Sequence, residues 1–241
     1  MVLQVENLTK TYKNGRGAED ISFDLSPGQV LGLLGPNGSG KTTTMKAIAG
    51  LIYPTSGISR VCGFDTSKNH EQAAQNTGCL IEAPALYEHM TAYQNMKLAA
   101  RFYDAVDDAR IMEVLRLVEM EKYSKEKVGM FSLGMRQRIG LALAMLSEPK
   151  LLILDEPANG LDIEGMVYVR KVVVEAAEKG AAVLISSHLA NEIQQCATKV
   201  AIMYGGKLLC VKDMDVILAG FPSLEDFFLA QVSMMKEGVA A

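Results

Sequence analysis

The chain has 241 residues, of which 49% are hydrophobic and 22% are charged, and it carries a formal net charge of −4 with a pI near 5.5. This length fits one domain, or a domain with a subdomain, around a substantial core, and the acidic balance argues against nucleic acid as a partner. The four cysteines show no zinc or disulfide spacing, which predicts buried free thiols. Since no apolar run approaches the roughly 18 residues of a membrane span and the N-terminus lacks a signal-peptide pattern, we expect a cytoplasmic chain.

The first part of the chain is predicted to form a small sheet. Residues 2–8 alternate between apolar and polar side chains, and residues 21–25 read as a second strand. Clusters rich in glycine, asparagine and proline at 14–17 and 26–28 predict turns on either side of that second strand. An apolar run at 30–34 then predicts a further strand, buried in the core.

A glycine-rich octapeptide follows, Gly35-Pro36-Asn37-Gly38-Ser39-Gly40-Lys41-Thr42, and a helical segment at 42–50 begins at its end. This is the pattern G-x-x-x-x-G-K-[ST] in the strand-loop-helix context that it requires. The glycines let backbone N–H groups converge on phosphate oxygens, and the helix N-terminus adds partial positive charge. We expect Lys41 to reach the β- and γ-phosphates as a catalytic residue, Thr42 to ligate Mg²⁺, and Thr43 to contact the nucleotide. A glycine-rich turn before a helix is the alternative.

Beyond this loop the chain is predicted to alternate between sheet and helix. Residues 91–146 show little strand signal and much helical periodicity, as where Ile111, Val114 and Leu115 share one face. We therefore expect a helical subdomain inserted between elements of the sheet. The other expected elements are strands at 58–62, 78–81, 151–154, 182–186, 200–204 and 207–211, the last two forming a hairpin, and helices at about 162–178, 190–195 and 224–235.

Two acidic residues stand at the end of the apolar strand at 151–154. A buried strand of this kind delivers Asp155 and Glu156 to its C-terminal end, where open α/β sheets bind ligands. Asp155 is then placed to hold Mg²⁺ opposite Thr42, and Glu156 is the candidate base that polarises the attacking water. A structural role would be an equal alternative for such a pair standing alone, but the preceding phosphate-binding pattern favours the functional interpretation.

With these two motifs, the sequence resembles the ATP-binding subunits of ABC transporters over nearly its whole length. The resemblance implies an α/β fold: a P-loop NTPase core with a mixed sheet, an antiparallel β subdomain and an inserted α-helical subdomain. We expect one ABC-type ATP-binding domain over 1–241, with the core at about 1–85 and 150–220, the helical subdomain at about 86–149 and a helical tail at about 221–241. ATP and Mg²⁺ are the implied ligands.

The resemblance also implies a signature motif at the start of a helix. The family usually carries L-S-G-G-Q where this chain has Phe131-Ser132-Leu133-Gly134-Met135, so Leu133 replaces a glycine and Met135 a glutamine. Ser132 can still cap a helix whose N-terminus meets a γ-phosphate. The resemblance therefore assigns nucleotide contacts to Ser132 and Gly134, with a plain N-capped helix as the alternative.

Three more segments take their interpretation from the family. His188 follows the strand at 182–186 and resembles the switch histidine that contacts the γ-phosphate, so we expect it to be catalytic. Tyr12 occupies the position of the aromatic residue that stacks on adenine. Residues 158–162 resemble the D-loop, which touches the partner subunit. A structural histidine, and an exposed or core tyrosine, are the alternatives.

A further departure from the family pattern lies after the strand at 78–81. The family usually places a glutamine after the strand at 78–81, to sense Mg²⁺ and the attacking water, and this chain has Glu82 there. A carboxylate can still bind the metal or the water, although it loses the amide donor, so we expect a catalytic and metal-binding role. Glu82 with the stretch that follows it resembles the bacitracin-resistance and lantibiotic-immunity branch, which exports peptide antibiotics or otherwise protects the cell envelope.

The resemblance implies a complex of several chains. ATP would join two nucleotide-binding subunits head to tail, identical or different, with the Ser132 helix of one completing the site of the other. Because the chain has no membrane span, we expect a separate permease, contacted near 82–93, to hold it on the inner face of the membrane. Three rivals are a soluble ABC-type ATPase, an ATP-binding module with little turnover, and another P-loop enzyme such as a nucleotide kinase. This subunit does not identify the cargo, which the permease recognises.

Overall fold

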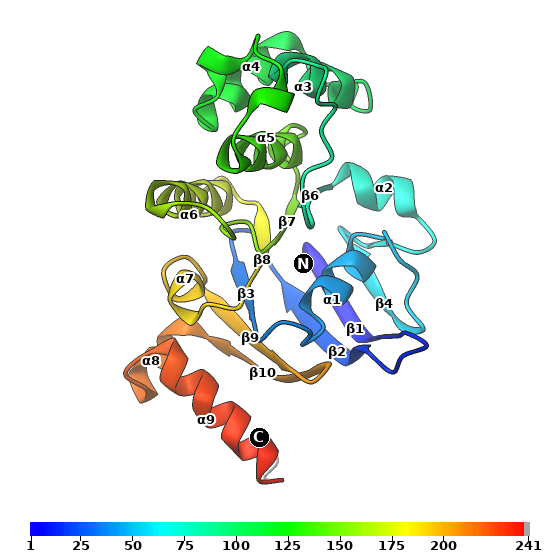
Figure 1. Cartoon of the computed structure of the whole chain (residues 1–241). Coiled ribbons are helices and arrows are strands. Elements are labelled where there is room, and N and C mark those ends of the chain that lie inside the picture. Colours follow the sequence, from blue (N-terminus) through cyan, green and yellow to red (C-terminus); the bar gives the residue numbers. More distant parts are fainter. Residues whose placement is uncertain (239–241) are drawn as a thin grey trace.

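The computed structural model describes residues 1–238, so the last three residues of the expected helical tail lie outside the described part. The described residues form one ten-stranded sheet with the order β5-β4-β1-β2-β10-β9-β3-β8-β7-β6. Helices pack on both faces of this sheet, and a further group of helices extends beyond the edge that β6 forms (Figure 1). The predicted α/β fold with a mixed sheet is confirmed.

One half of the sheet is a set of parallel strands. It comprises β3 (Val30–Leu34), β6 (Thr77–Leu80), β7 (Leu151–Asp155), β8 (Ala182–Ser187) and β9 (Lys199–Tyr204), paired in the order β9-β3-β8-β7-β6. Every residue of β3, β7 and β8 is buried, as expected for strands covered on both faces. Because these strands are parallel, their carboxyl ends meet at one edge of the sheet.

The other half of the sheet is antiparallel. It comprises β1 (Leu3–Thr11), β2 (Gly17–Leu25), β4 (Ser56–Val61), β5 (Phe64–Asp65) and β10 (Lys207–Asp213), the last of which pairs with β9 in the predicted hairpin. The antiparallel β9–β10 pair joins the two halves, and within the second half β2 and β10 pair in parallel. The predicted antiparallel subdomain is therefore continuous with the nucleotide-binding half.

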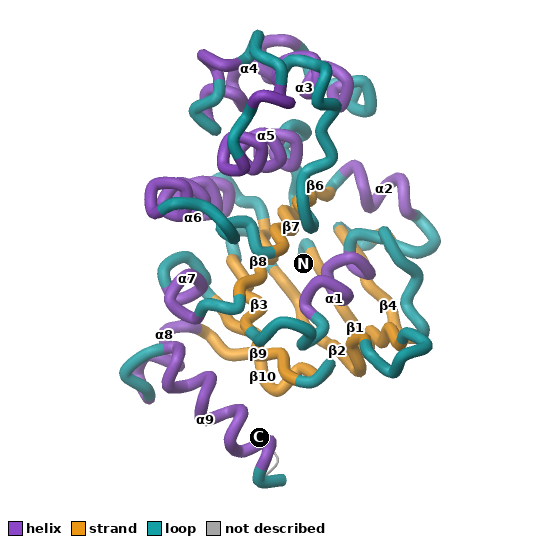
Figure 2. Tube along the Cα trace, in the orientation of Figure 1, coloured by secondary structure: helices purple, strands orange, loops and turns teal. Residues whose placement is uncertain are grey.

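Alternate side chains of the central strands enter two separate hydrophobic cores. On β7, Leu152 and Leu154 face one core, while Leu151 and Ile153 face the other. Figure 2 shows the helices that cover these two faces. The first core also contains residues of α6 (Ile163–Glu178), α7 (Ala190–Gln194), α8 (Met214–Gly220) and α9 (Leu224–Lys236); the second contains residues of α1 (Lys41–Ile48) and α2 (His70–Gln75).

The regular elements described between β6 and β7 are all helical. They are α3 (Ala92–Ala100), α4 (Asp108–Leu117), two 3₁₀ turns at Glu121–Tyr123 and Val128–Met130, and α5 (Leu133–Met145). Side chains of Thr91, Asp107 and Ser132 cap the three α-helices at their N-termini. Ile111, Val114 and Leu115, which are predicted to share one apolar face, are completely buried.

Three short elements escaped the sequence analysis: β5, α2 and α8. Each is shorter than the window over which hydrophobic periodicity can be recognised. Among residues 1–238, no single helix is long and apolar enough to cross a bilayer; α8 and α9 pass that test only as a pair, with a bend of 84° between them.

The cysteines are free, as predicted, but they are not all buried. Cys79 is exposed, because it lies on the edge strand β6 and alternates there with Leu80, which points into the core. The other three thiols are partly buried. The prediction of buried thiols is therefore wrong for Cys79.

Candidate functional site

The glycine-rich loop connects β3 to α1 in a conformation that requires glycine. Gly38 and Gly40 have φ angles of 82° and 101°, in the left-handed region. A Cβ at Gly40 would also lie 2.7 Å from the carbonyl oxygen of Gly17, and a Cβ at Gly35 would lie 2.2 Å from that of Met203. The loop therefore adopts this shape only because side chains are missing at these positions.

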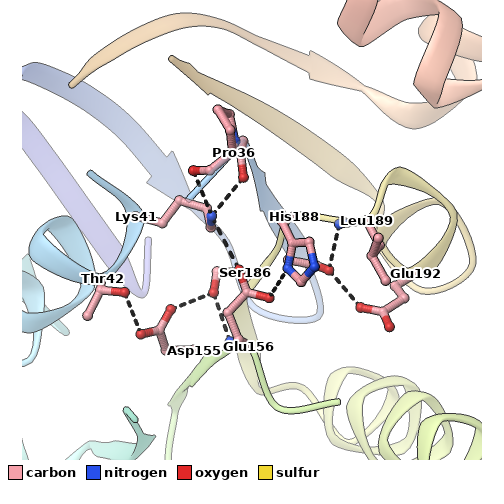
Figure 3. A network of polar contacts seen from close by, with 11 residues as sticks. Pro36, Lys41, Thr42, Asp155, Glu156, Ser186, His188, Leu189 and Glu192 are labelled. Carbon is pink, nitrogen blue, oxygen red and sulfur yellow. Dashed lines mark hydrogen bonds and ion pairs between the residues drawn. The ribbon is translucent and has the colours of Figure 1, made fainter. Parts of the chain in front are cut away.

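Two polar side chains of the loop suit an anion. Lys41, which is 5% exposed, donates from Nζ to the carbonyl oxygens of Gly35 at 2.7 Å and Pro36 at 3.3 Å, so its ammonium lies across the loop (Figure 3). Ser39 is also buried, and its Oγ has no hydrogen-bond partner among the described residues. An unpaired hydroxyl beside an ammonium and a helix N-terminus is a fitting cradle for phosphate oxygens.

Oxygen ligands suited to Mg²⁺ converge beside this cradle. Thr42 Oγ1 donates to Asp155 Oδ2 at 2.7 Å, and Ser186 Oγ donates to Asp155 Oδ1 at 2.6 Å (Figure 3). A hydroxyl and one carboxylate are a typical protein contribution to Mg²⁺, which takes its other ligands from phosphate and water. Residues 1–238 contain no cluster of three or more His, Cys, Asp or Glu side chains that could hold a metal ion.

Glu156 links the loop to the neighbouring strand β8. Its Oε2 lies 2.8 Å from His188 Nδ1, and its Oε1 lies 3.2 Å from Lys41 Nζ in an ion pair that lacks hydrogen-bond geometry. Its backbone N–H donates to Ser186 Oγ at 2.9 Å. Glu156 also has a φ of 48°, a strained conformation for glutamate that costs about 1–3 kcal/mol. The surrounding contacts hold this carboxylate where the adjacent strand and the loop meet.

A second set of contacts fixes the turn that carries His188. Ser187 Oγ donates to Glu192 Oε2 at 2.6 Å and accepts from the backbone N–H of Leu189 at 3.0 Å. These bonds tie the end of β8 to the start of α7 on either side of the histidine (Figure 3). The roles of Ser186, Ser187 and Glu192 are not predicted from the sequence motifs; the signal available for them is two serines at the end of an otherwise apolar strand.

Tyr12 shares a cavity with the glycine-rich loop. Its side chain is 40% exposed, and Lys10 Nζ lies 5.6 Å from the ring centroid. The cavity has a volume of about 280 Å³ and joins the aromatic ring to the phosphate cradle, as adenine stacking would require. Its lining comprises Tyr12, Asn14, Arg16, Gly17, Asn37, Gly38, Gly40, Lys41, Thr42, Thr43 and Glu156.

Ser132 and Gly134 are not brought to this cavity within one chain. Ser132 Oγ accepts from the backbone N–H of Met135 at 3.3 Å at the start of α5, as expected of an N-cap. Both residues line a separate cavity of about 770 Å³, beside the N-terminus of α6. A Cβ at Gly160 would lie 3.0 Å from Leu133 Cδ2, so the segment 158–162 packs against the start of α5.

Glu82 lies at the edge of the site and has a partner that the sequence analysis did not name. It lies two residues after the end of β6, the strand beside β7, with a φ of 62°, and its side chain is 64% exposed. Its Oε1 accepts from Lys46 Nζ at 2.6 Å, and Lys46 lies one helical turn after Thr42 on α1. The carboxylate is therefore engaged by a cation close to the predicted metal ligands.

Comparison with known proteins finds a matching family and similar proteins and structures. Residues 18–159 match the family described as ABC transporter. The bacitracin transport ATP-binding protein BcrA of Bacillus licheniformis is 39% identical over 209 residues, which cover 86% of this chain and 68% of that protein. The lantibiotic transport ATP-binding protein SrtF of Streptococcus pyogenes is 35% identical over 235 residues, which cover 98% and 99%. A solved structure of an ATP-binding subunit of an ABC transporter superposes with a TM-score of 0.87 at 29% identity, over 96% of this chain and all of the other.

Proposed function

Since the chain belongs to the ABC transporter family, we propose that it is the ATP-binding and ATP-hydrolysing subunit that powers a membrane exporter of peptide antibiotics. The observation that carries this proposal is the continuous polar network at the carboxyl ends of the parallel strands. It connects Lys41, Glu156 and His188 on one side, and Thr42 and Asp155 on the other, through Ser186. These are the groups that hydrolysis of a bound triphosphate requires.

Different residues bind the phosphates, the adenine and the metal ion in this proposal. Backbone N–H groups of residues 35–40, with Lys41 and Ser39, hold the phosphates, and the Tyr12 ring stacks on adenine. Thr42 and Asp155 would hold Mg²⁺, which would neutralise negative charge on the phosphate oxygens. Positioning and electrostatic stabilisation of this kind account for most of the catalysis in phosphoryl transfer.

Glu156 performs the proton chemistry in this proposal. Its carboxylate accepts a proton from the attacking water, and His188 holds Oε2 through the 2.8 Å contact. Phosphate oxygens compete with Oε1 for the Lys41 ammonium, so nucleotide binding draws Lys41 away from the carboxylate. Binding of the substrate would in this way release the base for its reaction.

We also propose that a second nucleotide-binding chain completes the site. In one chain the N-terminus of α5 points into a different cavity, so Ser132 and Gly134 need a head-to-tail partner to meet a phosphate. Large apolar side chains near the starts of α5 and α6 support a covered surface there: Met130 is 82% exposed and Ile163 is 79% exposed. The division into core, helical subdomain and tail retains the expected boundaries as part of this proposal.

The remaining partner is a permease on the inner face of the membrane. The relatives named above are transport ATP-binding proteins for bacitracin and lantibiotics, which supports an exporter of peptide antibiotics. We place the contact at residues 82–93, where Tyr87 is 53% exposed. The buried amide of Asn95 holds this segment, accepting from Tyr87 N–H at 2.8 Å and donating to the Tyr87 carbonyl at 3.2 Å. An exposed loop whose conformation is held by the Asn95 side chain is a suitable surface for the permease to contact.

The test is purification of the tagged chain from native membranes, followed by measurement of ATP hydrolysis. We expect a membrane-spanning subunit to co-elute and the complex to release phosphate, and Lys41→Ala to abolish that release. A chain that hydrolyses ATP but brings down no membrane subunit would indicate the soluble ATPase. A complex that binds ATP without turnover would indicate the binding module instead.

A further inference from the structure

The loop between β1 and β2, residues 12–16, is closed by its own hydrogen bonds beside the phosphate-binding loop. Tyr12 N–H donates to the Arg16 carbonyl at 2.8 Å, and Gly15 N–H donates to the Tyr12 carbonyl at 2.9 Å. Arg16 N–H donates to Asn14 Oδ1 at 3.1 Å. The loop therefore holds Tyr12, at one end, directly beside Arg16, at the other.

The residue that follows Arg16 touches the phosphate-binding loop. A Cβ at Gly40 would lie 2.7 Å from the Gly17 carbonyl oxygen, and a Cβ at Gly206 would lie 3.2 Å from the same atom. Gly17 itself has a φ of 150°, and a Cβ there would lie 1.8 Å from the Lys10 carbonyl oxygen. Three backbone segments therefore meet closely at Gly17, which contacts the phosphate-binding loop. Because Arg16 is the residue before Gly17, its backbone is held beside that loop.

Arg16 also lines two cavities that meet at this point. One is the cavity of about 280 Å³ that contains Tyr12 and Lys41, and the other, of about 450 Å³, lies over Gly38 and the turn of the β9–β10 hairpin. Within residues 1–238, Arg16 forms no ion pair with a carboxylate. The adjacent acids are engaged elsewhere: Glu19 lies 3.8 Å from a lysine and Asp20 accepts from an asparagine amide at 2.7 Å.

From this placement we propose that Arg16 is a nucleotide-binding residue that donates hydrogen bonds to the phosphate chain of ATP. An unpaired guanidinium that lines the same cavity as the Tyr12 ring and the Lys41 ammonium suits phosphate oxygens, which accept its planar fork in two parallel bonds. The inference rests on the proposed function, because it assumes that ATP occupies the cavity shared by Tyr12 and Lys41. It adds to the site a cation outside the glycine-rich loop.

The test is equilibrium binding of ATP and of GTP to the purified full chain and to Arg16→Ala, by displacement of a fluorescent ATP analogue. We expect Arg16→Ala to weaken both nucleotides by about five- to tenfold, the size typical of a charge-assisted hydrogen bond that is partly open to solvent. We expect Arg16→Lys to recover part of the loss, because it keeps the charge but not the fork. The loss should shrink at high salt, because solvent ions screen the charge.

Lys13→Ala is the matched control, since Lys13 is an exposed cation of the same loop that lines neither cavity. It should bind both nucleotides as the unaltered chain does, and thermal unfolding should show that every variant is folded. Equal affinities for Arg16→Ala and the unaltered chain would overturn the proposal. So would a loss confined to ATP, which would indicate a contact with the base. If the unaltered chain binds no ATP, the proposed function fails together with this inference.

Discussion

Replacement of Glu156 by glutamine tests the chemistry at the point where the site is most constrained. The substitution keeps the shape of the side chain but removes its charge and its ability to accept a proton from water. Because Oε2 is held by His188 at 2.8 Å, the amide should occupy nearly the same position as the carboxylate. We therefore expect ATP hydrolysis to fall by about 10²–10⁴-fold, the contribution typical of a positioned general base.

The same substitution should tighten ATP binding. The Glu156–Lys41 ion pair has a separation of 3.2 Å and joins side chains that are 20% and 5% exposed. A pair of this accessibility is worth about 1 kcal/mol, near the upper end of the range for exposed pairs. Phosphate oxygens no longer have to compete with that pair in Glu156→Gln, so the dissociation constant for ATP should fall about fivefold.

Two assays separate these effects. Phosphate release by the purified complex measures hydrolysis, and size-exclusion chromatography of the chain with ATP and Mg²⁺ should reveal a trapped dimer in Glu156→Gln. Glu178→Gln is the matched control, because it makes the same chemical change at an exposed position on the far end of α6. Hydrolysis at the unaltered rate in Glu156→Gln would refute the assignment of the base, and a monomer under trapping conditions would refute the head-to-tail partner.

Three further outcomes are expected. Glu82→Gln breaks an exposed ion pair and should leave ATP affinity unchanged while altering hydrolysis by the complex; a loss of affinity as large as that of Lys41→Ala would exclude this role. Ile153→Ala leaves a cavity at a completely buried position in β7 and should lower the free energy of unfolding, measured in urea, by about 2–5 kcal/mol. Val216→Ala, at a 62% exposed position, should lower it by less than about 0.5 kcal/mol. Equal effects of the two substitutions would contradict the described core. Burial raises the pKa of the Cys196 thiol from 9.0 to about 11, so iodoacetamide should label this thiol slowly at pH 8. The stability that the protonated thiol contributes should be complete below pH 9 and should be lost as the pH rises through 11. Labelling as fast as in the urea-unfolded chain would contradict this.

Local patterns in the sequence account for the central motifs of the site. The octapeptide ending at Thr42 and the apolar strand ending at Asp155 are each contained within a few consecutive residues, and each carries its own strand or helix context. The alternating and helical periodicities likewise predict most of the longer strands and helices, because those patterns repeat several times within each element. The two-residue strand β5 and the two-turn helix α8 give no clear repeat from which to predict them.

The partners of the predicted residues could not be read from those patterns, because they are distant in the chain. Glu156 reaches Lys41 and His188 only because β3, β7 and β8 are neighbours in the sheet. The ion pair of Glu82 and the position of Arg16 likewise depend on where α1 and the β1–β2 loop pack.

The sequence by itself determined that a glycine-rich loop joins a strand to a helix and that a carboxylate ends a buried strand, since both are local patterns with a local backbone requirement. The roles predicted for them, phosphate and metal binding, stay part of the proposed function. Only the tertiary structure decided that Ser132 lies in a separate cavity and that Gly17 brings Arg16 against the loop. The physical reason is that these relations follow from strand order and from close backbone contacts, and neither is encoded in any short stretch of residues.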